Sequence, residues 1–185
     1  MKNLFDSDFS QTLYWQVIAI IGGLFAGSLL AIYTNQILLI PGIFIILPGF
    51  LDMRGNIGGS LTSRLSSGLL VGVISPRKMW KSRIVRGNTL ASFFSAVIIS
   101  LILGLTAFFV NYVIFGVVFF NIIFIALFAV IIANVIEIPL AIFLTFHFFK
   151  KGVNPDNVMG PIVAMTGDVV SIFSLLISIL ILTII

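Results

Sequence analysis

Charged residues are scarce in this sequence. Only 9% of its 185 residues are Asp, Glu, Lys or Arg, whereas a typical soluble domain carries about 25%. Apolar residues make up 60%, and the mean hydropathy is +1.26. Because so little polar surface cannot cover a globule in water, the composition excludes an ordinary soluble domain and indicates that lipid is the solvent.

Cysteine is absent, and histidine occurs once, at His147. The lack of thiols excludes disulfides and thiolate metal sites, and a single imidazole argues against zinc or copper. Oxygen donors remain, from carboxylates, Asn, Ser, Thr and backbone carbonyls, and these are the ligands of hard cations. We interpret His147, close to Lys150, as a membrane-interface residue.

Two long runs, 13–51 and 87–136, contain no charged residue. A transmembrane helix needs roughly 20 apolar residues, so each run is long enough for two spans. The runs are apolar on all sides, which favours helices over barrel strands. The sequence predicts an all-α integral membrane protein with one transmembrane domain over 1–185. Residues 1–12 are expected to form a short interfacial lead-in, capped near Ser10, with no signal peptide and no soluble domain.

We predict five spans, at about 13–33, 37–74, 89–110, 117–149 and 158–185. The second cannot be one regular helix, because Pro41, Pro48 and the glycine-rich stretch 55–59 interrupt it. A broken helix at membrane depth is tolerated only beside protein or a water-filled cavity. The fourth span is long and is predicted to be irregular near 134–139.

Basic residues are concentrated in two connections. Five of the ten Lys and Arg residues lie in 75–88 and two in 150–157. The positive-inside rule then places these connections and the N-terminus in the cytoplasm, and the C-terminus outside a plasma membrane. Membrane topology thus accounts for the net charge of +4 without a nucleic-acid partner.

Three acids fall within or at the edge of predicted spans: Asp52, Glu137 and Asp168. A charge at membrane depth costs about 2.5 to 3.5 kcal/mol on insertion scales and marks an ion path by default. Asp52 has Arg54 and Arg64 as alternative ion-pair partners. Nothing obvious stands opposite Glu137 or Asp168, so these acids call for a compensating cation.

Polar and small residues follow the acids at helical spacing. In the last span Asp168 shares such a stripe with small residues, whose close packing explains the glycines and serines but not the acid. The stripes comprise Gly160, Ala164, Gly167, Asp168, Ser171, Ser174 and Ser178 in the last span; Asp52, Asn56, Gly59, Ser63 and Ser67 in the second; and Asn134, Glu137, Ala141 and Thr145 in the fourth. We interpret Glu137, Asn134, Thr166 and Ser171 as candidates for an ion path or for coupling.

The donor set suits Mg²⁺, which keeps several waters and is usually held by one or two carboxylates. A lone Asp168 beside freed carbonyls at the glycine break fits that preference. Composition alone does not separate Mg²⁺ from Ca²⁺, Mn²⁺ or Na⁺, and no organic cofactor is indicated.

Two segments carry a family resemblance. PGFLDMRGNIGGSLTSRLSSGL, residues 48–69, is similar to the second-helix motif of the MgtE family and the related solute carrier family 41. NPDNVMGPIVAMTGDVVS, residues 154–171, resembles the fifth helix of the solute carrier version. The five spans and their orientation also agree with the membrane domain of MgtE.

This resemblance implies a magnesium channel or transporter that assembles as a homodimer around a central pore. It assigns the ion-binding carboxylate to Asp168, with backbone oxygens at Ala164, Asp52 and Gly55, and Asn56 shaping the helix break. It leaves open whether flux is channel-like or coupled to Na⁺ or H⁺.

The sequence departs from the family pattern at two places. The stretch after the motif asparagine reads Gly58, Gly59, Ser60 where MgtE has Asn-Gln, and the acid Asp52 replaces an uncharged residue. Selectivity and coupling are therefore expected to differ from MgtE. The cytosolic regulatory domains of MgtE are absent from these 185 residues, so its mode of gating is not expected.

Two other function classes remain as alternatives. Asp52 and Asp168 could form the paired carboxylates of an intramembrane aspartyl-type enzyme, although no matching Tyr-Asp motif accompanies Gly167-Asp168. A structural membrane subunit is the other alternative.

Overall fold

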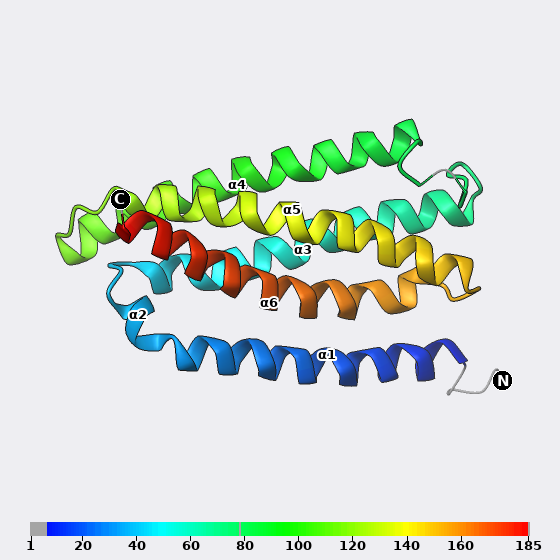
Figure 1. Ribbon diagram of the computed structural model, residues 1–185, viewed down its shortest axis with the longest axis horizontal. Coiled ribbons are helices and arrows are strands. Elements are labelled where there is room, and N and C mark those ends of the chain that lie inside the picture. Colours follow the sequence, from blue (N-terminus) through cyan, green and yellow to red (C-terminus); the bar gives the residue numbers. More distant parts are fainter. Residues whose placement is uncertain (1–6, 78, 185) are drawn as a thin grey trace.

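The computed structural model of the protein describes residues 7–77 and 79–184, all of whose regular structure is helical (Figure 1). Residues 1–6, half of the expected lead-in, lie outside the described residues. The rest of the lead-in already belongs to the first helix. The helices are α1 (Ser7–Ile32), α2 (Thr34–Leu38), α3 (Ile43–Leu70), α4 (Arg83–Phe115), α5 (Asn121–Lys150) and α6 (Pro155–Ile184).

The second predicted span is broken, but only near its start. The chain leaves the helix after Leu38 and resumes at Ile43, with Gly42 at a φ of 79°. That backbone conformation favours glycine. The Asn111 side chain donates a hydrogen bond to the Pro41 carbonyl at 2.8 Å, which ties the break to α4.

The predicted break at 55–59 is wrong, because α3 continues through it as a regular helix. Glycine costs a helix only about 1 kcal/mol relative to alanine, whereas unpaired backbone groups in hydrocarbon cost several kcal/mol each. Continuing the helix is therefore the cheaper solution. For the same reason Pro48 stays within α3, and α5 runs unbroken through 134–139 with Pro139 inside it, where the sequence predicted irregularity.

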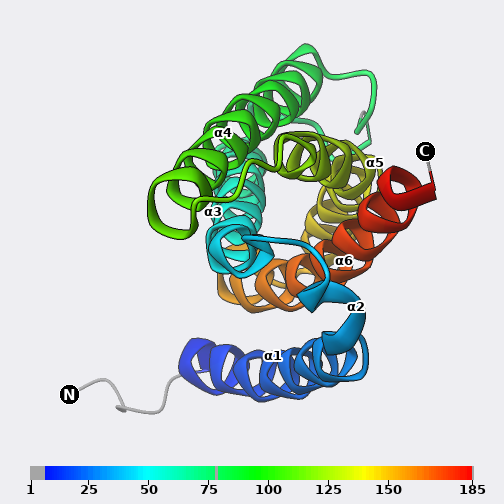
Figure 2. The same ribbon diagram turned by 90° about the vertical axis from the view of Figure 1, so that its left-hand side faces the viewer.

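The helices α3 to α6 alternate in direction and pack into one bundle (Figures 1 and 2). Its apolar core lies between α3, α4, α5 and α6 and includes the fully buried Phe50, Ile122 and Ala126. In contrast, α1 packs mainly on α6 and leaves most of its surface exposed. The α1 helix stands to one side of the bundle in the end-on view of Figure 2.

Within the described residues, four helices are long and apolar enough to cross a membrane: α1, α4, α5 and α6. The 28-residue α3 is of similar length but carries Asp52, Arg54 and Arg64. The structure therefore confirms an all-helical membrane protein, and α3 differs from its neighbours in holding charges along its length.

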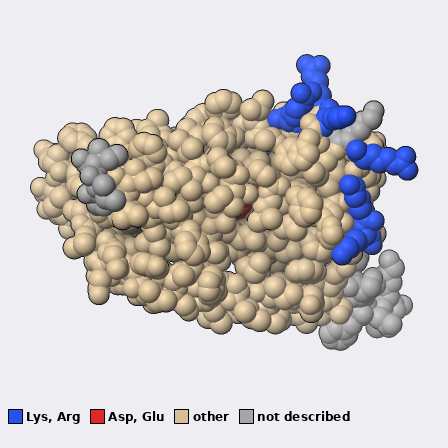
Figure 3. Space-filling model, viewed as in Figure 1, with Lys and Arg blue, Asp and Glu red and all other residues tan. Residues whose placement is uncertain are grey.

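Basic side chains gather at one end of the bundle (Figure 3). The α3–α4 and α5–α6 connections both lie there, and α1 starts at the same end. Arg77, Lys81, Lys150 and Lys151 are exposed at these connections. The two connections that carry most of the positive charge are thus on the same side of the molecule.

Candidate functional site

A buried ion pair joins α3 to α5 at the centre of the bundle. Arg54 and Glu137 are each 2% exposed, and the guanidinium of Arg54 donates one hydrogen bond to Glu137 Oε2 and another to Asn134 Oδ1. Glu137 Oε1 accepts no hydrogen bond within the described residues. The expectation that nothing stands opposite Glu137 is therefore wrong, since Arg54 neutralises it.

Neither arginine on α3 pairs with Asp52. Asp52 is exposed and accepts a hydrogen bond from Asn56 Nδ2 at 2.9 Å. Arg64 is also exposed, and its Nε donates to the Ser60 carbonyl of its own helix. The ion-pair alternative for Asp52 is therefore wrong, and Arg54 instead faces inward.

Sequence reasoning missed the Arg54–Glu137 pair, although a signal was present. Arg54 shares its helical face with Phe50, Leu61 and Leu65, which are all buried. An arginine placed on the apolar face of a helix needs a buried acid, because an unpaired charge in the interior is costly. Glu137 is such an acid, on the buried stripe predicted for α5, all four members of which are buried.

Two glycines make room for the Glu137 carboxylate. A methyl group placed on Gly167 of α6 would lie 3.0 Å from Glu137 Oε1, and one placed on Gly58 of α3 would lie 3.3 Å from the same atom. A methyl on Gly58 would also overlap the Val163 side chain of α6. The absence of both Cβ atoms lets α3, α5 and α6 close around one carboxylate.

Replacing Gly58 by alanine is expected to destabilise the protein by about 1 to 3 kcal/mol, as overpacking does. The control is Gly59→Ala, since a methyl there would meet nothing within 4 Å. Both changes bring the same gain in helix propensity, so their difference isolates the clash. Thermal unfolding in detergent measures it, and equal midpoints for the two variants would contradict the described packing.

Asp168 lies beside this cluster on α6, and its side chain is half-buried. Arg54 of α3 packs against Gly167, the residue before it: a methyl on Gly167 would lie 3.9 Å from Arg54 Cβ. Within the described residues, the Asp168 carboxylate has neither an ion pair nor a hydrogen bond. The sequence predicted that both Glu137 and Asp168 need a cation. Of these two, only Asp168 lacks a countercharge among the described residues.

The line of contact between the antiparallel helices α3 and α6 is called the α3–α6 seam here. Arg54 faces Gly167 across it, and Gly58 faces Val163. When two residues of antiparallel helices are in contact, the next residue of each helix lies on the same side of that contact. The next residues along each helix therefore share one side of the seam: Gly55 at the level of Asp168, and Gly59 at the level of Ala164.

This side of the α3–α6 seam is open. Methyl groups placed on Gly55, Gly59 or Gly160 would meet nothing within 4 Å, and Ala164 is exposed. The structure thus brings together three of the predicted ion-binding residues, namely Gly55, Ala164 and Asp168. Asn56 and Asp52 lie further round α3, on its exposed face.

The small and polar residues that the sequence grouped on one stripe of α6 differ in burial. Gly160, Ala164 and Asp168 line the open side of the seam. The remaining members are buried within the bundle: Gly167, Ser171, Ser174 and Ser178. Ser178 Oγ, for example, donates to the Ile125 carbonyl of α5 at 2.8 Å. Small residues between membrane helices commonly allow such close packing.

The remaining candidates for an ion path are Thr166, Ser171 and Asn134. Thr166 is half-buried, and its hydroxyl donates to the Ile162 carbonyl of its own helix at 2.9 Å. Ser171 is buried, and Asn134 is bound to Arg54. Thr166 and Asn134 are thus engaged with protein, whereas the Ser171 hydroxyl has no hydrogen-bond partner within the described residues.

The backbone oxygens predicted as ligands lie within regular helices. Because 55–59 is helical, the Gly55 carbonyl is not freed by a break, and Ala164 is likewise inside α6. A carbonyl oxygen has two lone pairs, so each can still accept a bond from a water. Within the described residues no three Asp, Glu or His side chains cluster.

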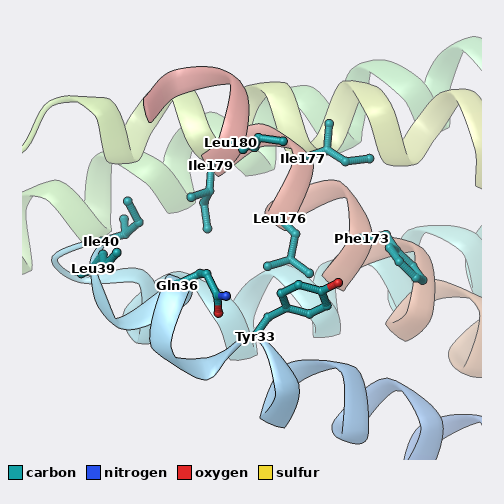
Figure 4. Close-up of a pocket in the computed structure, with 9 residues that line it drawn as sticks. All are labelled: Tyr33, Gln36, Leu39, Ile40, Phe173, Leu176, Ile177, Ile179 and Leu180. Atoms are coloured by element: carbon teal, nitrogen blue, oxygen red, sulfur yellow. The ribbon is translucent and has the colours of Figure 1, made fainter. Parts of the chain in front are cut away.

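A separate cavity of about 440 Å³ lies at the far end of α6 (Figure 4). One wall is the turn from α1 into α2, with Tyr33 and Gln36, and the other is α6 from Phe173 to Leu180. Figure 4 shows that apolar side chains fill most of its lining. No acid lines this cavity, so it does not belong to the candidate ion site.

Apolar helices packed around a buried ion pair, with an unneutralised acid on an open seam, define a helical membrane protein of the ion-transporter class. Residues 47–178, more than half of the chain, match the MgtE family, described as divalent cation transporter. The chain therefore belongs to the MgtE family of divalent cation transporters.

One curated relative is solute carrier family 41 member 2 of Mus musculus. It is 26% identical over 135 residues, which cover 70% of this chain and 23% of the relative. The chain thus matches less than a quarter of that protein's length. Both comparisons name transporters, so the intramembrane enzyme alternative is not supported.

Proposed function

We propose that this chain transports divalent cations, Mg²⁺ first, along the open side of the α3–α6 seam, with Asp168 as the principal ion-binding carboxylate. One observation carries the proposal. Arg54 neutralises Glu137, and this leaves Asp168 as a half-buried acid on a membrane helix without a countercharge among the residues that the structure describes. A cation from solution is the countercharge that hydrocarbon cannot supply.

The position of Asp168 also supports assembly as a homodimer. Each chain brings the Asp168 carboxylate to the open side of the seam, so two chains related by a two-fold axis would bring two carboxylates to one ion path. Two carboxylates can balance the charge of one divalent ion. Gly55, Gly59 and Gly160 keep this side of the seam free of side chains, and such small residues let membrane helices approach closely. The open sides of two chains would enclose the ion path.

Mg²⁺ is favoured over a dehydrated ion by the donors that the seam offers. Mg²⁺ gives up its waters reluctantly and is commonly held by one or two carboxylates through a partly intact hydration shell. Asp168 supplies the carboxylate, while the carbonyl oxygens of Gly55 and Ala164 can accept hydrogen bonds from ion-bound waters. Asp52 and its hydrogen-bond partner Asn56 lie on the exposed face of α3. They would contact the ion at a different level of the path from Asp168.

The same proposal includes α3 as a fifth span within a single transmembrane domain. Its inward charge Arg54 is neutralised inside the bundle, so the helix can lie at membrane depth beside the four apolar ones. The basic end would face the cytoplasm of a plasma membrane, with the start of α1 inside and the end of α6 outside.

Flux into liposomes tests the proposal. Purified protein is expected to carry Mg²⁺ into vesicles, with Ca²⁺, Mn²⁺ and Na⁺ as competitors that rank its selectivity. Repeating the measurement with Na⁺ and H⁺ gradients clamped separates a channel from a coupled transporter. Vesicles that contain correctly inserted protein and take up no divalent cation would contradict the transport function and leave a structural subunit.

A further inference from the structure

We propose that Glu137 is a positioning residue for ion binding: it holds the Arg54 guanidinium against α5 and so keeps this positive charge away from Asp168. The inference deepens the proposed transport function and rests on it. Glu137 itself would touch neither the ion nor its waters, because it is 2% exposed and lies inside the bundle.

Arg54 pairs with one acid and begins next to the helix segment that carries another. Its Cβ packs against α6 at Gly167, and the next residue of that helix is Asp168. The side chain then extends to α5, where its two terminal nitrogens donate to Glu137 Oε2 and Asn134 Oδ1. Arg54 therefore begins beside Asp168 but pairs with a different acid, Glu137, on a different helix.

This pairing matters because Arg54, without it, would compete with a transported cation for the Asp168 carboxylate. Opposite charges attract strongly over several ångströms in a protein interior. A guanidinium freed from Glu137 would neutralise Asp168 in place of the ion, or repel the ion from where it stands. Glu137 prevents both outcomes by cancelling the Arg54 charge locally, and Gly58 and Gly167 admit its carboxylate at the required place.

A charge-cancelling role predicts a different pattern of variants from a merely structural one. Glu137→Gln keeps the size and a hydrogen-bond acceptor for Arg54 but leaves the arginine charge uncompensated. The double variant Arg54→Gln/Glu137→Gln removes both charges and returns the cluster to neutrality. If the charge of the cluster controls ion binding, the double variant should transport more Mg²⁺ than the single variant. If only the native contacts matter, it should transport no more.

The experiment measures Mg²⁺ uptake into liposomes and, separately, the thermal stabilisation of detergent-purified protein by Mg²⁺. Glu137→Gln is expected to lower uptake and to raise the Mg²⁺ concentration needed for stabilisation, each by about tenfold or more. Glu137→Asp, which keeps the charge, and the double variant are expected to stay within about threefold of the wild type.

Wild-type behaviour of a correctly inserted Glu137→Gln would overturn the inference. So would a double variant as inactive as the single one, because that result indicates a structural role. If Glu137→Gln does not insert, the double variant decides alone: retained uptake supports charge cancellation, and lost uptake overturns it. A wild-type protein without Mg²⁺ flux or stabilisation would instead contradict the proposed function itself.

Discussion

Replacing Asp168 by asparagine is expected to abolish Mg²⁺ flux while the protein still inserts and folds. The substitution keeps the size of the side chain and removes an intramembrane carboxylate that has neither an ion pair nor a hydrogen bond among the described residues. Losing a carboxylate ligand removes the interaction that offsets partial dehydration of the ion, and a drop of about a hundredfold or more follows from a loss of roughly 3 kcal/mol. Stabilisation of the purified protein by Mg²⁺ should disappear with it.

The matched control is Asp156→Asn, which removes an exposed acid from the first turn of the same helix. It changes the net charge by the same amount but lies at the basic end, outside the seam. Flux in this variant should remain close to the wild type. If Asp168→Asn retained normal flux, or if both variants lost it equally, Asp168 would not be the ion-binding carboxylate.

The second large effect concerns stability. Arg54→Met should destabilise the protein by about 3 to 5 kcal/mol, because it leaves the Glu137 carboxylate buried without its partner. The double variant Arg54→Met/Glu137→Met should recover much of this loss, since apolar residues of similar volume often replace a buried ion pair at little cost. Thermal or denaturant unfolding in detergent micelles measures both.

Arg64→Met is the control for this series. Arg64 lies on the same helix but is exposed, and within the described part of the chain it bonds only to the carbonyl of Ser60 in its own helix. Its removal should change the free energy of unfolding by less than about 0.5 kcal/mol. A similar loss for Arg54→Met and Arg64→Met would show that the buried pair contributes no more than a surface residue.

Much of the fold follows from local properties of the chain. The charge-free runs predicted membrane helices, and the positions of the basic residues predicted which connections share an end. The helix boundaries were less accurate because interfacial turns extend the helices: α4 begins at Arg83 and ends at Phe115, whereas the sequence predicted 89–110. The low helix propensity of glycine in water predicted a break at 55–59. The helix continues there because unpaired backbone groups in lipid cost more than glycine in a helix.

The candidate site was predicted only in part. Helical spacing grouped Gly160, Ala164 and Asp168 correctly, since neighbours on one helix face are set by the sequence alone. Which of the flanking serines turn inward depends on where α5 packs, and the spacing carries no information about that. The pairing of Arg54 with Glu137, 83 residues apart in sequence, likewise depends on the contact between α3 and α5.

The sequence by itself determined that this chain dissolves in lipid, that it is helical, and that a few ionisable residues lie at membrane depth, because these properties depend on composition and local periodicity. Only the tertiary structure decided which acids are neutralised. An ion pair is a property of two helices brought together: Arg54 cancels Glu137, whereas Asp168, one residue beyond the same contact, has no ion-pair partner among the described residues.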